Sequence, residues 1–460
     1  MLKKDIVNLN IKQKEFFNSG KTYDITFRLE NLIKLMQVIV ENENRILETL
    51  YLDLHKSQIE AYTSEIDYVI KEIDYFTKNL KRLCKSQKVK TSFINQPARS
   101  YVLNEPLGNV LIISPWNYPF GLLFTPLVGA MAAGNNVILK PSEISSNTSK
   151  LINEIITQNF PNEYIAVVEG DANTTQMLIN EYVDFIFFTG STNVGKIIMK
   201  SAAEYLIPMT LELGGKNPCL VDFETDLKIA ADRIAWGKFF NAGQTCIAPD
   251  YLLIHRKIQN EFLELLKLSI ERLYPDSSKN KDYSHIINNQ HYERLSNLLK
   301  EGKIIYGGIC NAKEKYISPT IISEINYNSN SMQDEIFGPI LPVLIYDNLE
   351  DEIKQFKNLP KPLAFYFFSN NKKKQQLIIE NTRSGSLCIN GTMHIILNNR
   401  LPFGGVGSSG FGRYHNRESF ETFSNKKSIM NKKTWWDFKQ IYPPYKTTLD
   451  ALKKALRLIN

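Results

Sequence analysis

The sequence contains little cysteine and no apolar run long enough to cross a membrane. Its five cysteines among 460 residues include no Cys-x-x-Cys pair, which argues against a disulfide framework and a structural zinc site. No metal site is therefore expected. The most apolar stretch, residues 107–133, is interrupted by Pro115, Pro119 and Pro126, so it cannot form the clean helix of ~20 residues that a bilayer requires. A reducing cytoplasm is the expected location.

The chain also lacks a large excess of one charge. It carries 55 Lys and Arg against 48 Asp and Glu, a net charge of +7. No nucleic-acid partner is expected, because that would require basic residues clustered on one face. Residues 1–17 contain neither a long apolar segment nor a small-residue cleavage site, so no secretory signal is expected. The length suggests about three domains.

From residue 109 onward, short β-like runs alternate with helical segments. Residues 25–84 are expected to be helical, because apolar residues recur there at spacings of three and four, and residues 97–104 have an extended character. The alternation predicts an α/β fold with a parallel sheet, followed after residue 218 by a second α/β series. The predicted strands are Val110–Ser114, Asn136–Leu139, Tyr164–Val168, Phe185–Phe188, Pro218–Val221, Tyr251–Ile254, Leu341–Ile345 and Ala364–Phe368.

A glycine-containing turn follows one predicted strand. Gly190 comes just after Phe188, and Gly195 lies at the start of the next predicted helix. Such a turn lets the backbone approach a phosphate and presents helix N-terminal N–H groups to it. The spacing is not the usual Gly-x-Gly-x-x-Gly, and a tight strand-to-helix connection explains it as well.

Cys246 differs from the other cysteines in its local sequence. It ends the polar segment Asn241–Cys246, where Gly243 suits a bend that exposes a thiol, and partial exposure is what a nucleophilic cysteine needs. Cys219 and Cys388 lie in apolar runs and are interpreted as small buried residues.

Glu212 is a carboxylate among apolar residues, just before Gly214 and Gly215. Burial raises the pKa of a carboxyl toward the range of a general base at neutral pH. The adjacent glycines would let the backbone pass close to a flat ligand. A pair with a Lys or Arg is the alternative explanation.

Together these segments resemble the aldehyde dehydrogenase family. Seven motifs appear in the family's order: Pro115–Phe120, Leu139–Glu143, Phe188–Thr192, Leu211–Lys216, Gly243–Cys246, Glu335–Pro339 and Pro402–Gly407. Residues 361–366 and 403–413, followed by Phe420–Ser424, are similar to the class 3 branch, whose members act on fatty and aromatic aldehydes and are typically dimeric. The resemblance implies a Rossmann-like NAD-binding domain, an α/β catalytic domain and a small β oligomerisation extension.

The resemblance also implies the catalytic residues. Cys246 is expected to attack the aldehyde, with the Asn117 amide and the Cys246 backbone N–H stabilising the oxyanion. Glu212 is expected to activate the water that hydrolyses the thioester. A relative that transfers the acyl group to CoA, and a catalytically silent structural protein on this fold, are the alternatives; the presence of Glu212 argues against the first, and the intact trio argues against the second.

NAD is the implied cofactor, with NADP as an alternative. The resemblance assigns contacts with it to Lys140 and Glu143 (adenosine ribose), Gly190, Ser191 and Gly195 (pyrophosphate), Gly214 and Gly215 (nicotinamide), and Glu335 and Phe337 (nicotinamide ribose). The candidates for an aromatic substrate tunnel, which would suit apolar or aromatic aldehydes, are Tyr118, Trp236, His394 and Phe403.

The implied domain division is discontinuous in sequence. It comprises a cofactor domain (1–84 and 103–209), a catalytic domain (210–395), an extension that pairs subunits of a homodimer (85–102 and 396–430) and a tail (431–460). The sequence of the tail predicts a basic amphipathic helix, a pattern typical of segments that make weak contact with an anionic membrane surface. Packing of this helix against the body of the protein or against a partner subunit is the alternative. Its apolar stripe is Leu449, Leu452, Leu456 and Ile459.

Overall fold

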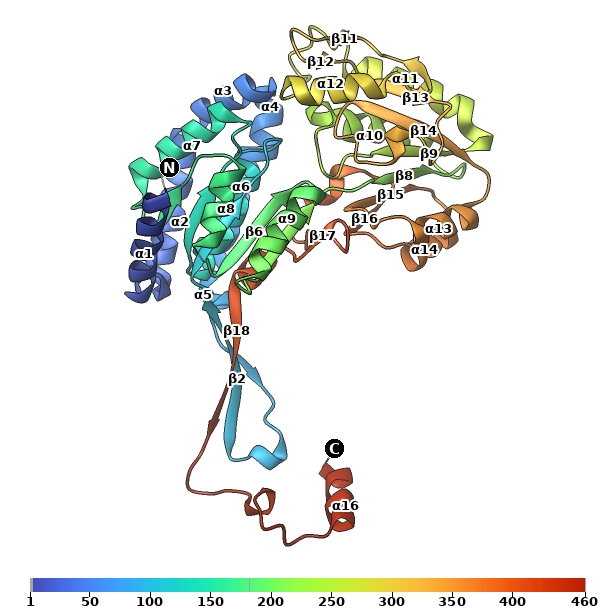
Figure 1. Cartoon of the computed structure of the whole chain (residues 1–460). Coiled ribbons are helices and arrows are strands. Elements are labelled where there is room, and N and C mark those ends of the chain that lie inside the picture. The colour runs from blue at the N-terminus through green and yellow to red at the C-terminus, as the bar shows by residue number, and fades with distance from the viewer. Residues whose placement is uncertain (1–2, 182, 460) are drawn as a thin grey trace.

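The computed structural model describes residues 3–181 and 183–459. It contains two α/β lobes and a long β arm that points away from both of them (Figure 1). The first lobe holds a six-stranded sheet, the second a seven-stranded sheet and the arm a three-stranded sheet. The predicted α/β fold class is confirmed.

The six-stranded sheet has the order β17-β7-β6-β3-β4-β5. Five strands are parallel, and β17 adds an antiparallel edge to β7. The strand order reverses between β3 and β6, and in such sheets the ligand site lies in the crevice at the carboxyl ends of these strands. The strands are β3 (Asn109–Ile113), β4 (Asn136–Lys140), β5 (Ile165–Val167), β6 (Phe185–Gly190), β7 (Met209–Leu213) and β17 (Gly410–Phe411).

Both faces of this sheet are covered by helices, which explains why its strands are continuous apolar runs. In β3, Val110 and Ile112 face the larger core, whereas Leu111 and Ile113 face the smaller one. The helices on the larger core are α2 (Ile25–Glu41), α3 (Glu43–Leu54), α5 (Asp67–Leu83), α6 (Gly121–Ala133) and α7 (Ser146–Asn159); those on the smaller core are α1 (Lys3–Asn18), α8 (Ala172–Asn180) and α9 (Thr192–Ala203).

The helical region predicted over residues 25–84 is confirmed, but it is interrupted. Between α3 and α5, the short helix α4 (Gln58–Ala61) leads into a π-helical turn, η2 (Tyr62–Ile66). Helix α1 was not predicted from its mixed polar sequence; it is held by buried Gln13, which donates to the Val137 carbonyl oxygen at 3.2 Å.

The seven-stranded sheet has the order β10-β13-β14-β9-β8-β15-β16, parallel except for β10. Its strands are β8 (Pro218–Val221), β9 (Tyr251–His255), β10 (Lys303–Tyr306), β13 (Thr320–Ser323), β14 (Ile340–Tyr346), β15 (Ala364–Phe368) and β16 (Ser386–Ile389). Its helices are α10 (Leu227–Phe239), α11 (Gln259–Leu273), α12 (Asn289–Leu298), α13 (Leu349–Asn358) and α14 (Lys372–Asn381). A small hairpin pairs β11 (Cys310–Asn311) with β12 (Tyr316–Ile317).

The arm consists of β1 (Gln87–Val89), β2 (Ala98–Pro106) and β18 (Ser424–Lys432). Part of the segment expected to form the extension lies elsewhere, because β17 joins the first sheet and α15 (Arg417–Thr422) packs against α6. The division into domains otherwise stays a prediction. Beyond the arm, the chain ends in α16 (Leu449–Ile459), which Figure 1 places far from both lobes.

The tail is strongly exposed in this chain. Trp435 is 76% exposed and Leu449 is 64% exposed, while the side chains of Leu456 and Ile459 lie outside the described part of the structure. Among residues 3–181 and 183–459, no helix is both long enough and apolar enough to span a bilayer.

Candidate active site

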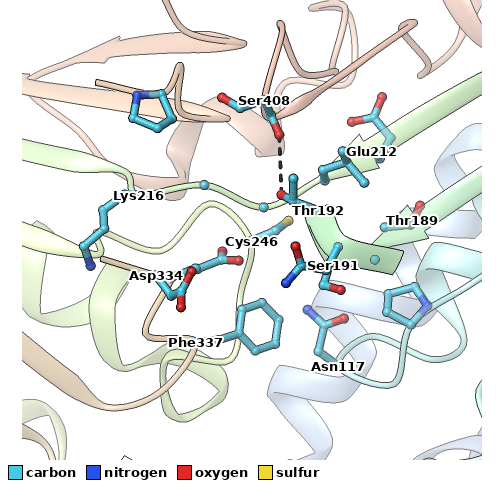
Figure 2. Close-up of a pocket in the computed structure, with 18 of the residues that line it drawn as sticks. Asn117, Thr189, Ser191, Thr192, Glu212, Lys216, Cys246, Asp334, Phe337 and Ser408 are labelled. Carbon is cyan, nitrogen blue, oxygen red and sulfur yellow. Dashed lines mark hydrogen bonds between the residues drawn. The ribbon is translucent and has the colours of Figure 1, made fainter. Parts of the chain in front are cut away.

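A cavity of about 570 Å³ opens at the carboxyl ends of β3, β6 and β7. It is lined by segments that follow each of these strands and by the loops of the second lobe that face them. Asn117, Glu212 and Cys246 all line it. In the view of Figure 2, Cys246 lies between Glu212 and Asn117. The topology therefore brings the three predicted catalytic residues to one place, although they lie far apart in the sequence.

The bend that presents Cys246 is formed by three consecutive residues in left-handed conformations. Asn241, Ala242 and Gly243 have φ values of 52°, 50° and 72°. A Cβ atom on Gly243 would lie 2.3 Å from the Gly338 carbonyl oxygen, so only glycine fits there. Non-glycine residues in this conformation are strained, and such strain is concentrated at functional sites.

The surroundings of Cys246 favour the protonated form of its thiol. Burial raises the pKa of the thiol well above its usual 9.0, and the negative charges of Glu335 and Glu212 raise it further. The backbone N–H groups of Cys246 and Ile247 oppose this shift because they donate to the sulfur. Burial and the two carboxylates thus disfavour the thiolate form of Cys246.

Glu212, on β7, is 2% exposed, and neither carboxylate oxygen accepts a hydrogen bond from the described residues. Burial raises the pKa of Glu212 well above 4.5, and the positive charge of Arg413 opposes this shift. A buried carboxyl without a partner is costly and marks a functional group. The alternative explanation, in which Glu212 is paired with a Lys or Arg, predicts a hydrogen bond to one of its oxygens. The described residues form no such bond.

Asn117 is 1% exposed and lies in the loop between β3 and α6. Its Nδ2 donates to the Gln244 carbonyl oxygen at 3.0 Å, which leaves the second N–H of the amide for another acceptor. Gln244 stands two residues before Cys246, so this bond connects the amide to the bend of the thiol.

The start of α9 faces the cavity. Ser191 caps this helix by accepting from the Val194 N–H at 3.3 Å, and Gly190 to Asn193 line the cavity. The N-terminus of a helix offers free N–H groups and a favourable dipole to a phosphate. Gly195 has a different role: a Cβ there would lie 2.7 Å from Leu213 Cδ2, so it allows close packing of α9 on β7.

Glu335 and Phe337 line the cavity opposite α9. A Cβ on Gly214 would lie 1.9 Å from Glu335 Oε2, so a side chain at position 214 would displace the carboxylate. The pKa of Glu335 is raised to about 8 by burial and by Asp250, while the Gly215 N–H opposes this shift. Phe337 contacts the Trp116 ring edge to face, with centroids 5.3 Å apart.

Lys140 and Glu143 do not line this cavity, although the resemblance assigns them to the cofactor. Lys140 is 2% exposed, and its Nζ donates to Glu143 Oε2 at 3.3 Å and to the Pro141 carbonyl oxygen at 2.8 Å. Lys140 ends β4, which lies next to β3 in the sheet, and it forms a salt bridge with the exposed carboxylate of Glu143.

The four tunnel candidates lie outside the lining of the cavity. Tyr118 donates to or accepts from Thr245 Oγ1 at 2.6 Å. Trp236 contacts His394 with ring centroids 4.9 Å apart, and His394 is exposed. Phe403 is buried. Sequence reasoning missed Arg413, whose only sequence signal was its place at the end of the glycine-rich segment.

Two further groups escaped sequence reasoning. Tyr68 and His415 form a hydrogen-bonded pair, and burial, followed by the negative charge of Glu72, raises the pKa of the Tyr68 phenol. Lys56 and Glu65 form an ion pair whose side chains are fully buried. No local motif could have indicated them, because their partners come from distant segments.

The family model described as "Aldehyde dehydrogenase family" matches residues 5–429. The chain belongs to the aldehyde dehydrogenase family. It is 44% identical over 443 residues to 4,4'-diaponeurosporen-aldehyde dehydrogenase of Staphylococcus aureus (strain NCTC 8325 / PS 47), covering 96% of each chain. It is 44% identical to a dimeric NADP-preferring aldehyde dehydrogenase of Canis lupus familiaris, covering 93% of this chain and 95% of that protein.

A solved structure of Staphylococcus aureus AldH in a substrate-bound state has the same fold. The TM-score is 0.95 at 43% identity, covering 98% of this chain and 99% of that one. These comparisons confirm the predicted family and the predicted activity: the protein is an aldehyde dehydrogenase that depends on NAD or NADP. The glycine cradle at Gly214 and the free helix start at Ser191 fit such a cofactor.

Proposed function

We propose that Cys246 is the nucleophile of this aldehyde dehydrogenase, that Asn117 stabilises the oxyanion and that Glu212 is the general base. The observation that carries the proposal is their common place on one cavity. A thiol, an amide donor and an unpartnered buried carboxyl are the three groups that acyl transfer to water requires.

In the proposed mechanism, the Cys246 sulfur attacks the aldehyde carbon, and the thiol proton passes to solvent water. The electron pair of the carbonyl moves to oxygen, where the Asn117 amide and the Cys246 backbone N–H donate hydrogen bonds to the thiohemiacetal oxyanion. NAD(P)⁺ supplies a hydride acceptor. Cys246 then holds the acyl group as a thioester, and Glu212 takes a proton from the water that attacks it. As the C–S bond breaks and the carboxylic acid leaves, Glu212 passes this proton to the Cys246 sulfur, which restores both the thiol and the carboxylate.

The residues proposed to hold the cofactor are grouped by the part of it that they would contact. Gly190, Ser191 and the start of α9 would bind the pyrophosphate, while Glu335 and Phe337 would hold the nicotinamide ribose beside Gly214 and Gly215. We further propose that Lys140 and Glu143 flank the adenosine ribose. The buried cation attracts a 2′-phosphate and the exposed carboxylate repels it, which supports NAD as the main cofactor with NADP as an alternative.

We propose an apolar aliphatic or aromatic aldehyde as the substrate. Tyr118 hydrogen-bonds Thr245 next to Cys246, and Trp236 and Phe403 belong to the same hydrophobic cluster as Cys246. These aromatic side chains support the proposal, because aromatic walls favour apolar ligands. A panel of short, long-chain and aromatic aldehydes, followed by absorbance of the reduced cofactor, tests it. We expect kcat/KM to exceed that for acetaldehyde by at least ~10-fold for the apolar substrates. A preference for charged or two-carbon aldehydes would contradict the proposal.

Transfer of the acyl group to CoA is the competing outcome of the same thioester. The retained base Glu212 supports hydrolysis instead. Likewise, a silent structural protein would have no need for an unpartnered buried carboxyl beside a thiol. Five free cysteines support a reducing, cytoplasmic location.

A homodimer is the proposed assembly. The outer face of α9 and the turn after it expose apolar side chains: Val194 (44%), Ile197 (61%), Met199 (49%) and Leu206 (89%). Apolar patches of this kind mark protein interfaces, and the canine relative is named as dimeric.

For the tail, we propose weak contact with an anionic membrane surface. Its exposed apolar residues Trp435 and Leu449 and its basic residues Lys453, Lys454 and Arg457 support this contact.

Two variants test the dimer interface and the membrane contact of the tail separately. Ile197→Asp is expected to raise the dissociation constant of the dimer by about 100-fold or more, because it buries a charge in the interface; light scattering measures the mass. Truncation after residue 446 should leave the dimer and its activity intact and reduce flotation with anionic liposomes. An Ile197→Asp dimer of unchanged stability, or unchanged flotation of the truncated chain, would remove the respective proposal.

A further inference from the structure

A buried ion pair lies behind the loop that carries Asn117. Lys56 and Glu65 are paired, and both side chains are 0% exposed. Burying two charges costs free energy that their mutual attraction does not always offset, so such a pair is weak evidence for stability. What the two side chains hold besides each other is therefore the informative question.

Lys56 holds the backbone of Asn117. Its Nζ donates to the Asn117 carbonyl oxygen at 2.8 Å and lies 3.9 Å from the centroid of the Tyr118 ring. Asn241 Nδ2 donates to the same carbonyl oxygen at 3.0 Å. Because a carbonyl oxygen has two lone pairs, both acceptor positions of Asn117 are taken, and the orientation of this peptide group is fixed.

Glu65 holds the other end of the same loop. Its Oε2 accepts from the Phe120 N–H at 2.9 Å and from the Gly121 N–H at 3.2 Å. Gly121 begins α6, so the carboxylate satisfies free N–H groups at the N-terminus of this helix. Glu65 itself comes from the π-helical turn η2, a conformation frequent at functional sites.

The side chain of Asn117 depends on this backbone. Its Nδ2 donates to Gln244, and Gln244 Nε2 donates to the carbonyl oxygens of Asn241 at 3.1 Å and His285 at 2.9 Å. Asn117 Oδ1 has no hydrogen-bond partner among the described residues. The amide is thus held by one bond of its own and by the position of its main chain.

We propose that Lys56, together with Glu65, positions the oxyanion donor. The pair fixes residues 117–121 at both ends and thereby aims the Asn117 amide at the carbon that Cys246 attacks. Lys56 does not line the cavity, so it is a positioning residue that acts through Asn117. This inference rests on the proposed role of Asn117. A catalytic group displaced by ~1 Å can cost about 100-fold in rate, so the effect is measurable.

A double-mutant cycle in the full chain tests the inference. The variants are Asn117→Ala, Lys56→Met and the two combined. They are assayed by NAD-linked aldehyde oxidation and by cofactor-free hydrolysis of p-nitrophenyl acetate, an activated ester on which a thiol attack forms the same oxyanion. Asn117→Ala should lower kcat by ~100- to 1,000-fold and Lys56→Met by ~10- to 100-fold in both assays, with the KM for NAD within about 3-fold. The double variant should match Asn117→Ala alone, because the two residues act as one unit.

Arg28→Met is the matched control. Arg28 is a 5% exposed cation that donates to the carbonyl oxygens of Thr22 and Ala132, and it does not line the cavity. This variant should lower the melting temperature without a change in kcat. If Lys56→Met does not fold, Lys56→Met/Glu65→Gln replaces it, since glutamine still accepts from the backbone N–H groups and leaves no unpaired charge.

The outcomes separate the two claims. Full activity of Asn117→Ala would mean that the proposed oxyanion donor is wrong, and the inference would fall with it. If Asn117→Ala is impaired but Lys56→Met or Lys56→Met/Glu65→Gln keeps wild-type kcat, the positioning role is overturned. It is also overturned if the losses of Lys56→Met and Asn117→Ala multiply in the double variant.

Discussion

Replacing Cys246 with alanine is expected to lower aldehyde oxidation by about 10⁴-fold or more, because Cys246 is the one thiol among the described residues that line the cavity. Absorbance of NADH measures the rate. The variant should still fold and bind NAD, since the side chain removed is small and half-buried.

The matched control is Cys310→Ala. Cys310 is exposed on β11 and does not line the cavity, so the same chemical change there should leave kcat/KM within about 2-fold. Substantial dehydrogenase activity in Cys246→Ala would refute the proposed nucleophile. Equal losses in both variants would point to general damage by the substitution.

Glu212→Gln is expected to keep a burst of reduced cofactor and lose steady turnover. The hydride leaves before Glu212 acts on water, so the first equivalent of NADH forms, whereas hydrolysis should slow by ~100- to 10,000-fold. Rapid mixing with excess aldehyde measures both phases. A variant without a burst would reassign Glu212 to activation of the thiol.

The raised pKa of Glu212 gives this prediction a pH dependence. A base must be deprotonated, so wild-type turnover should rise with pH through a pKa above 4.5, and this limb should be missing in Glu212→Gln. Stability should move in the opposite direction. The folded chain binds this proton more tightly than the unfolded chain, so the contribution is complete below pH 4.5 and is lost as pH rises through the folded pKa. Glu212→Gln should therefore melt higher than wild type at high pH.

The two α/β series could be predicted from the sequence because their strands are buried on both faces and appear as short apolar runs. The bend that carries Cys246 could also be predicted from a local signal, because Gly243 and its polar neighbours indicated a turn. Helix α1 escaped prediction because its buried face is mixed: Ile6 and Leu9 lie beside the polar residues Asn10 and Gln13, so its sequence has no clear apolar stripe.

The environment of each site residue was harder to predict, because it comes from contacts across the sequence. Arg413 approaches Glu212 only because β17 pairs with β7. Lys56 reaches Asn117 from the turn after α3, and a single lysine in that turn has no sequence signal of its role. Lys140 and Glu143 show the same limit. Their motif could be recognised in the sequence, whereas their place outside the lining of the main cavity depends on the fold.

The pairing of β17 with β7 has a consequence for the order in which the enzyme can form during synthesis. Gly410 pairs with Glu212 across the edge of the first sheet, and β18 pairs with β2 along nine residues of each strand. Most of the chain must leave the ribosome before either contact exists, because long-range pairings wait for their partners. The proposed general base is therefore covered late, and a nascent chain lacking residues 410–460 would carry a complete thiol bend beside an uncovered carboxylate.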